Sequence, residues 1–189
     1  MAKKFIDLDK IVAEKNPKLH KRLPKFLFNY LKKIIWQDEV NRIIADNEGV
    51  NGIQFCHNVI KEFNIAAVIE GIENAPKTGG VTFASNHPLG GMDALAFIDQ
   101  FGYYRNDIKF IAKDILLHLK PKQDIFGGVN KMGNTAVPSL KNVDAVLAND
   151  ESVVIFPAGL VSRRTEGVVE DLQWKKTFVT RARKHNVPI

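Results

Sequence analysis

A histidine and an aspartate flank a double glycine in the segment SNHPLGGMD, residues 85–93, and these two side chains could do acid–base chemistry. His87 follows a short apolar run typical of a buried strand, and Asp93 opens a pattern typical of a helix. On one continuous helix, a separation of six residues would place them about 240° apart. They can meet only if Pro88–Gly91 form a tight turn, which the paired glycines permit.

Such a turn would let the Asp93 carboxylate hold one imidazole nitrogen of His87 and leave the other nitrogen basic. A pair of this kind can remove a proton from a hydroxyl group as its oxygen attacks an acyl carbon. The same residues also fit a purely structural role, in which Asp93 caps a helix and His87 ends a strand. Taken without the rest of the chain, this local pattern favours the structural role.

Short apolar strands alternate with helical patterns after residue 64, which predicts an α/β fold with a mostly parallel sheet flanked by helices. Residues 1–50 are predicted to form a basic amphipathic helical segment, and residues 51–189 the α/β domain. We expect helices at 5–15, 24–46, 51–63, 92–102, 114–119, 139–150 and 168–186, and strands at 64–71, 81–85, 107–113, 126–133, 151–159 and 187–189. Ser139 is the expected N-cap of its helix. Because the chain stops inside an apolar strand, we expect the domain to continue beyond Ile189.

In open α/β sheets, ligands bind beyond the carboxyl ends of the strands, and the distinctive residues of this chain follow predicted strands. The candidate binding residues are Asn86, Gly90, Gly91, Lys113, Lys131, Gly159, Arg163 and Arg164. The bases could bind a carboxylate or a phosphate, although any one of them alone is more often a solvated surface group. Ser162 lacks the glycine-flanked elbow of a serine nucleophile, and no phosphate-binding loop has the required spacing.

Bulk composition narrows the class of protein. The 189 residues suit one compact domain, and the single cysteine excludes an intrachain disulfide and suits a reducing compartment. The five histidines are scattered, so no metal site is expected. No apolar run approaches the roughly 18 residues of a membrane span, and the N-terminus does not resemble a signal peptide. A net charge of +6 favours an anionic partner.

Positive charge gathers near the N-terminus, where residues 15–37 hold seven Lys or Arg and no Asp or Glu. Bulky apolar residues lie among these bases at helical spacing, which suits the surface of an anionic bilayer. The alternative is a helix packed on the domain with a solvated charged face. Nucleic-acid binding is a further alternative, although no nucleic-acid-binding fold is indicated.

Several segments together resemble the glycerolipid acyltransferase family, which acylates glycerol phosphate and lysophosphatidic acid. SNHPLGGMD is similar to its first signature block, FIAKDIL with GGVNKMG to its second, VVIFPAGLVSRR to its third, and VPI to the start of its fourth. The resemblance covers residues 65–189 in the family's order. It implies that His87 is the general base and that Asp93 supports it. It also implies an acyl thioester donor on acyl carrier protein or coenzyme A, no metal or other cofactor, and a role in phospholipid biosynthesis. Residues 15–46 resemble the family's membrane-docking segment, which implies a peripheral protein on the cytoplasmic face of the membrane.

Two departures from the family pattern refine this expectation. Five residues separate His87 from Asp93 where the family usually has four, and Ala158 stands where the third block usually has glutamate. Both departures resemble the hemolysin-like branch, which is similar to O-acyltransferases that build ornithine or glycine lipids. The acceptor is therefore expected to be either lysophosphatidic acid-like or a hydroxy-acyl amino acid. The other functions considered are a thioesterase or lipid hydrolase, and a non-catalytic membrane or nucleic-acid binder.

Overall fold

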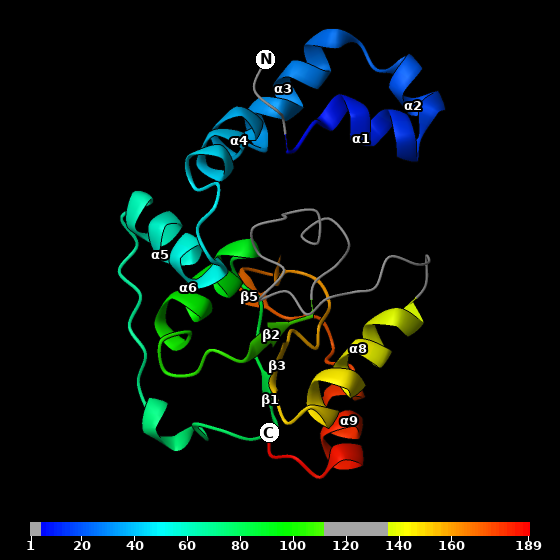
Figure 1. Ribbon diagram of the computed structural model, residues 1–189. Helices are drawn as coiled ribbons and strands as arrows, with labels where there is room; N and C mark the ends of the chain where they lie inside the picture. The colour runs from blue at the N-terminus through cyan, green and yellow to red at the C-terminus, as the bar shows by residue number, and fades with distance from the viewer. Residues whose placement is uncertain (1–4, 112–135) are drawn as a thin grey trace. The chain divides into compact units, whose positions relative to one another are not determined.

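A computed structural model describes residues 5–111 and 136–189 of the chain (Figure 1). The chain divides into two compact units, Met1–Gly49 and Val50–Ile189. The first is helical, and the second contains a parallel sheet with helices packed against it. The predicted α/β class is therefore confirmed. Lys113 and Lys131 lie outside the described residues, and so do the helix expected at 114–119 and the strand expected at 126–133.

The first unit consists of α1 (Leu8–Lys15), α2 (Pro17–Arg22), α3 (Lys25–Ile34) and α4 (Gln37–Asp46). Side chains of α4 hold the segment that leads into α1. Asn41 Oδ1 accepts hydrogen bonds of 2.8 Å from the backbone N–H groups of Phe5 and Ile6, and Gln37 Oε1 accepts one of 2.8 Å from Leu8. Asp7 caps α1 by accepting hydrogen bonds from the backbone N–H groups of its first turn.

The single helix predicted at 24–46 is two helices, so that prediction is wrong. Trp36 separates α3 from α4 in a left-handed conformation with φ of 52°, which no helix can continue through. The apolar spacing runs on through this break, because both helices bury one face. Periodicity therefore does not reveal the break.

The second unit is built around three parallel strands, β1 (Val81–Ala84), β2 (Ile108–Phe110) and β3 (Ser152–Ile155), in the order β1-β3-β2. Ser152 of β3 aligns with Val81 on one side and Ile108 on the other. The unit also contains α5 (Gly52–Glu62), the 3-10 helix η1 (Ile72–Asn74), α6 (Gly91–Phe101), α8 (Ala136–Ala148), the hairpin β4 (Arg163–Thr165) with β5 (Val168–Glu170), and α9 (Thr177–His185).

Alternation along the strands sends side chains to two different layers of helices. Phe83 and Phe110 align with the same residue of β3, and both rings belong to an aromatic cluster that includes Phe97 and Phe101 of α6. Each such aromatic pair contributes about 0.5–1.5 kcal/mol beyond its buried area. Val153 faces the opposite way and packs with the buried residues of α8, including Val143. The sheet is therefore covered by α6 on one face and by α8 on the other (Figure 1).

Several predicted elements differ from the structure. Residues 64–71 form no strand, and Val68 is 83% exposed, because none of the strands in the described part of the chain pairs with this apolar run. Residues 187–189 are also not a strand, although the Pro188 carbonyl accepts a hydrogen bond of 3.0 Å from Thr82. Helix α8 begins at Ala136, so Ser139 lies inside it and is not its N-cap.

The helix predicted at 168–186 is wrong in its first half. Residues Val168–Glu170 form β5, which pairs antiparallel with β4, and only Thr177–His185 are helical. The turn between β4 and β5 contains Gly167 at a φ of +88°. A glycine in this region permits the reversal that a two-stranded hairpin requires. The hairpin brings Asp171, which directly follows β5, to the candidate site.

Candidate active site

His87 and Asp93 are in contact at the carboxyl end of β1. His87 Nδ1 lies 2.9 Å from Asp93 Oδ2, and the two side chains are 17% and 13% exposed. A half-buried imidazole with one nitrogen engaged by a carboxylate has its tautomer fixed, with the proton on Nδ1. Its Nε2 is then the nitrogen that can accept a proton from a bound substrate.

The turn from Pro88 to Gly91 makes this contact possible. Gly90 has φ of 70° and ψ of −130°, a combination that L-residues with a side chain rarely adopt. The Leu89 N–H donates to Asp93 Oδ2 over 2.9 Å, and the Asp93 N–H donates to the Gly90 carbonyl over 3.1 Å. The carboxylate is therefore held by the turn as well as by the imidazole, which fixes its orientation.

Phe156, which follows β3, supports the imidazole from one side. The rings of His87 and Phe156 are stacked, with centroids 4.0 Å apart and an interplanar angle of 18°. The carboxyl ends of β1 and β3 are adjacent, and the Ser85 N–H donates to the Ile155 carbonyl over 3.1 Å. The parallel sheet thus brings the first and third signature segments together at one edge, as expected for an open α/β sheet.

Asp171 joins the histidine loop to the segment after β5, and it is absent from the predicted site residues. Its Oδ1 accepts hydrogen bonds from the His87 backbone N–H, over 3.2 Å, and from Ser162 Oγ. Its Oδ2 accepts one of 2.8 Å from Trp174 Nε1. The hydrogen bond from Ser162, together with those from Trp174 and His87, keeps the pKa of Asp171 below its ordinary value and the group ionised.

The sequence carries one signal that could have located Asp171. Gly167 lies between the short stretches that pair as β4 and β5, and a hairpin there would turn the chain back toward the end of β3. Ser162 lies on the other side of that hairpin, and its backbone N–H donates to the His87 carbonyl over 2.8 Å. Ser162 therefore contributes hydrogen bonds that position the loop.

The other predicted binding residues differ in how close they lie to the histidine. Asn86 is exposed next to it, and Gly91 begins α6 with open space where a side chain would be. Gly159 has φ of +71°, and its N–H donates to the Phe156 carbonyl over 3.0 Å. Ala158 is buried, 5% exposed, so the position where the family usually has glutamate is part of the core.

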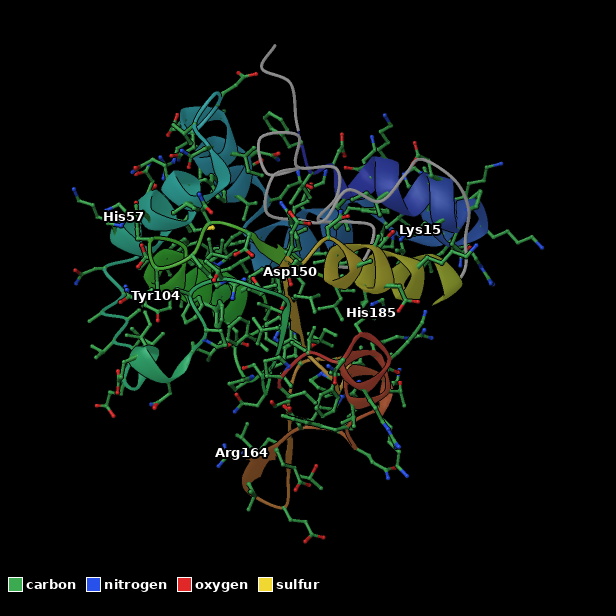
Figure 2. All side chains as sticks on the ribbon, turned by 60° about the horizontal axis from the view of Figure 1, so that its bottom comes forward. Lys15, His57, Tyr104, Asp150, Arg164 and His185 are labelled. Carbon is green, nitrogen blue, oxygen red and sulfur yellow. The ribbon has the colours of Figure 1, made fainter. Side chains whose placement is uncertain are left out.

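Several cations lie in the segments that follow β3. Arg163 and Arg164 are exposed on β4, and Arg163 directly follows the serine that is bonded to His87. Figure 2 shows Arg164 on the hairpin, which projects from the rest of the second unit. Lys175 is an addition to the predicted set, because its Nζ lies 3.6 Å from where a side chain on Gly159 would begin. Lys113 and Lys131 are not among the described residues.

A second histidine–aspartate pair provides an internal comparison. His57 Nδ1 of α5 lies 2.8 Å from Asp99 Oδ1 of α6, and the His57 side chain is 46% exposed. Figure 2 labels His57. Asp99 is six residues beyond Asp93 in α6, about 9 Å further along the helix axis. This pair joins two helices and does not follow a strand of the sheet, so hydrogen-bond geometry alone does not identify a catalytic histidine.

Two further observations concern metals and membranes. Within the described residues, no group of three His, Cys, Asp or Glu side chains is arranged to hold a metal ion. In the same part of the chain, none of the helices combines the length and the apolar character that crossing a bilayer requires.

Known proteins that are similar to this chain are acyltransferases. A family model described as Acyltransferase matches residues 10–188. The chain is 40% identical over 189 residues to a lyso-glycine lipid O-acyltransferase of Bacteroides thetaiotaomicron, with 98% of this chain and 70% of that protein covered. It is 38% identical over 179 residues to a lyso-glycine lipid O-acyltransferase of Phocaeicola vulgatus, with 94% of this chain and 64% of that protein covered. No solved structure matches the chain.

These matches confirm the predicted acyltransferase class and the likeness to amino-acid-lipid O-acyltransferases. The family model extends over both units and includes the contacting pair His87 and Asp93. This chain belongs to the acyltransferase family.

Proposed function

We propose that the protein is an O-acyltransferase that moves a fatty acyl group from a thioester to the hydroxyl of an anionic lyso-lipid. The observation that carries this proposal is the contact between His87 Nδ1 and Asp93 Oδ2 at the end of β1. The names of the two relatives favour a lyso amino-acid lipid, with glycine as the head group, over lysophosphatidic acid.

In the proposed reaction, Nε2 of His87 takes the proton from the acceptor hydroxyl as its oxygen attacks the thioester carbonyl carbon. The C–S bond of the resulting tetrahedral intermediate then breaks, and the thiolate leaves with the proton that the imidazolium returns. The products are an ester and a free thiol. Asp93 stabilises the imidazolium between these two steps and keeps Nε2 facing the substrate.

The oxyanion of the tetrahedral intermediate requires hydrogen-bond donors. The Gly159 N–H already donates to the Phe156 carbonyl, which leaves the first turn of α6 as the better source of free amides. Gly91 begins this helix, and the open space at its α-carbon lets a substrate approach the backbone closely. We therefore assign oxyanion stabilisation to the amides at Gly91 and Met92.

Arg163, Arg164 and Lys175 are proposed to bind the acceptor's anionic group, and Lys113 and Lys131 remain candidates for the same role. An arginine can bind a carboxylate through two parallel hydrogen bonds, which suits the free carboxylate of a glycine lipid. A buried alanine at position 158 removes a negative charge that would repel this carboxylate, since Ala158 lies next to Gly159. The donor is an acyl thioester of acyl carrier protein or coenzyme A, and no other cofactor is proposed.

Membrane association is proposed for the first unit, on the cytoplasmic face of the bilayer. Phe26, Tyr30 and Ile34 lie at i, i+4 and i+8 on α3 and are 73%, 60% and 55% exposed. Trp36, 61% exposed, follows the same helix, and exposed lysines lie beside these apolar groups. Aromatic rings with neighbouring bases suit the interface of an anionic bilayer.

The proposal is tested by replacing His87 with alanine. With a hexadecanoyl thioester and a lyso-glycine lipid, His87→Ala is expected to lower ester formation by at least about 1,000-fold, because the general base is lost. The control is His57→Ala, which removes the other histidine with an aspartate contact and should keep activity within about threefold when folded. Ester formation at the wild-type rate by His87→Ala would refute the mechanism.

The same assay separates acyl transfer from hydrolysis. Free fatty acid and ester are measured by mass spectrometry with and without the lyso-lipid. A transferase forms ester only when the acceptor is present, whereas a thioesterase releases fatty acid at the same rate in both samples. Equal release in both samples would favour the hydrolase.

A further inference from the structure

A second concentration of positive charge lies at the C-terminal end of the second unit, outside the residues assigned to the acceptor's anionic group except for Lys175. Residues 175–185 contain five Lys or Arg and no Asp or Glu. They include α9, which packs beside α8 (Figure 1). A helix with this charge distribution presents a strong positive potential wherever it is exposed.

Asp144 of α8 faces this helix, and several basic side chains surround its single carboxylate. Its carboxylate lies 2.9 Å from Arg181 Nη1, 2.9 Å from Lys184 Nζ and 2.8 Å from His185 Nε2. Lys141 lies exposed one turn before Asp144 on α8. One carboxylate cannot neutralise this many cations, so the junction of α8 and α9 keeps a net positive charge.

The outward face of α9 is formed by Lys176, Val179 and Arg183, which lie at i, i+3 and i+7. All three are exposed, and within the described part of the chain neither base has a side-chain hydrogen bond or an ion pair. We call the exposed bases of residues 175–185, together with the exposed base of the neighbouring turn of α8, the α9 basic surface. It consists of Lys141, Lys175, Lys176, Arg183 and Lys184.

This surface is connected to the active site. Lys175 donates its backbone N–H to the Pro157 carbonyl over 3.2 Å, and its Nζ lies beside Gly159. Pro157 follows Phe156, the ring stacked on His87. The positive surface therefore begins at the edge of the sheet where the thioester must react, and it runs along α9 for about 14 Å.

The composition of the α9 basic surface favours an acidic protein as its partner. A membrane-binding face carries large apolar side chains next to its bases, as α3 does, whereas the outward face of α9 has only Val179 between its charges. A small anionic ligand requires charges that converge in a concave site, and these charges are spread along an exposed helix. Spread charges suit the complementary acidic surface of a protein.

We propose that the α9 basic surface docks the acidic surface of an acyl carrier protein that delivers the thioester to His87. This inference rests on the proposed function, because the carrier protein is the acyl donor in that reaction. Docking beside Lys175 places the carrier at the edge of the sheet where Phe156 and His87 lie. The partner is recognised by charge, so binding should weaken as salt screens the surface.

The test uses the full 189-residue chain and its variant Lys176→Glu/Arg183→Glu. Donors are hexadecanoyl acyl carrier protein and hexadecanoyl coenzyme A, with the same lyso-glycine lipid as acceptor. The ratio of kcat/KM for the carrier to kcat/KM for coenzyme A is expected to fall at least tenfold in the variant. Anisotropy of the labelled carrier protein, measured without acceptor, should show the same loss of affinity.

The matched control is Lys61→Glu/Lys77→Glu, which changes the net charge equally at exposed positions away from α9. It should leave the donor ratio within about twofold. Because Lys176 and Arg183 are exposed, the reversal variant should unfold at the wild-type temperature, whereas the control also loses the contact of Lys77 Nζ with the Tyr104 ring. The milder Lys176→Gln/Arg183→Gln serves if the reversal does not fold, with an expected loss of about threefold.

The outcomes separate this inference from the proposed function. Wild-type protein that binds the carrier but forms no ester would contradict the proposed function and support the docking surface. Ester formation from the carrier that is unchanged in the reversal variant would contradict the docking surface alone. If the reversal variant no longer floated with phosphatidylglycerol vesicles but bound the carrier as tightly as the wild type, the surface would be assigned to the membrane and the inference would be overturned. A wild-type protein that accepts only the coenzyme A thioester would overturn it as well.

Discussion

The Asp171 carboxylate shows how much of the candidate active site depends on one residue. It holds the backbone of His87, the hydroxyl of Ser162 and the indole of Trp174, which belong to separate segments. Asp93 orients the imidazole ring, whereas Asp171 positions the loop that carries it. One aspartate thus acts on the side chain of the histidine and the other on its main chain.

Asp171→Asn is expected to lower the free energy of unfolding by about 1 kcal/mol near neutral pH, or about 2–4 °C in Tm. The pKa of Asp171 is lowered in the folded state, chiefly by the hydrogen bond from Ser162. Its ionised form therefore stabilises the fold above the unfolded-state pKa, and this stabilisation is lost as the pH falls through the lower folded-state pKa. Thermal unfolding between about pH 3 and pH 7 should show the difference from wild type shrinking below about pH 4.

Glu170→Gln is the control for this prediction, because Glu170 is an exposed carboxylate on the neighbouring residue. Its Tm should follow that of the wild type at every pH. A difference between Asp171→Asn and wild type that is as large at pH 3 as at pH 7 would show that the charge of Asp171 contributes nothing.

At the scale of the elements, the turn between β1 and α6 decides the geometry of the His87–Asp93 pair. A strand that ends in His87 must turn within a few residues so that the first turn of α6 brings Asp93 back to the imidazole. Gly90 makes this turn with a positive φ, and Gly91 begins the helix with an ordinary one. The two adjacent glycines therefore have different tasks.

Gly90→Ala is expected to destabilise the protein by about 1–3 kcal/mol, because its backbone conformation is strained for alanine. The new Cβ would also lie 3.4 Å from Val161 Cγ2. Because the strain shifts Asp93 relative to His87, ester formation should fall at least tenfold. Urea unfolding and the ester assay measure the two effects.

Gly91→Ala is the matched control, since a Cβ at this position would have no other atom within 4 Å and alanine favours a helix. Its stability should stay within about 0.5 kcal/mol of wild type or rise slightly. If Gly90→Ala proved as stable as Gly91→Ala and as active as the wild type, the turn would not control the geometry of the pair.

At the scale of the whole molecule, the two units have different surfaces. The second unit has its polar site at the carboxyl ends of β1 and β3, and the first unit exposes aromatic rings among lysines. An enzyme that acts on a lipid must bind both a charged head group and an interface. Each unit has a surface suited to one of these tasks.

Phe26→Ser/Tyr30→Ser is expected to lower binding to phosphatidylglycerol vesicles at least tenfold, because two exposed rings no longer enter the interface. Vesicle flotation measures this binding. Tyr103→Ser is the control, since Tyr103 is an aromatic residue of the second unit that is 66% exposed. Flotation of the double variant at the wild-type level would contradict a membrane role for α3.

The sequence by itself determined the fold class, the family and the contact between His87 and Asp93. Each of these depends on patterns within short segments of the chain. Alternating apolar patterns specify strands and helices locally, and the Pro88–Gly91 turn brings the aspartate back over six residues. Only the tertiary structure decided the role of Asp171, whose hydrogen bond to the His87 backbone spans 84 residues. It also decided that residues 64–71 form no strand and that Trp36 divides a helix, because pairing and packing with distant residues override local propensity.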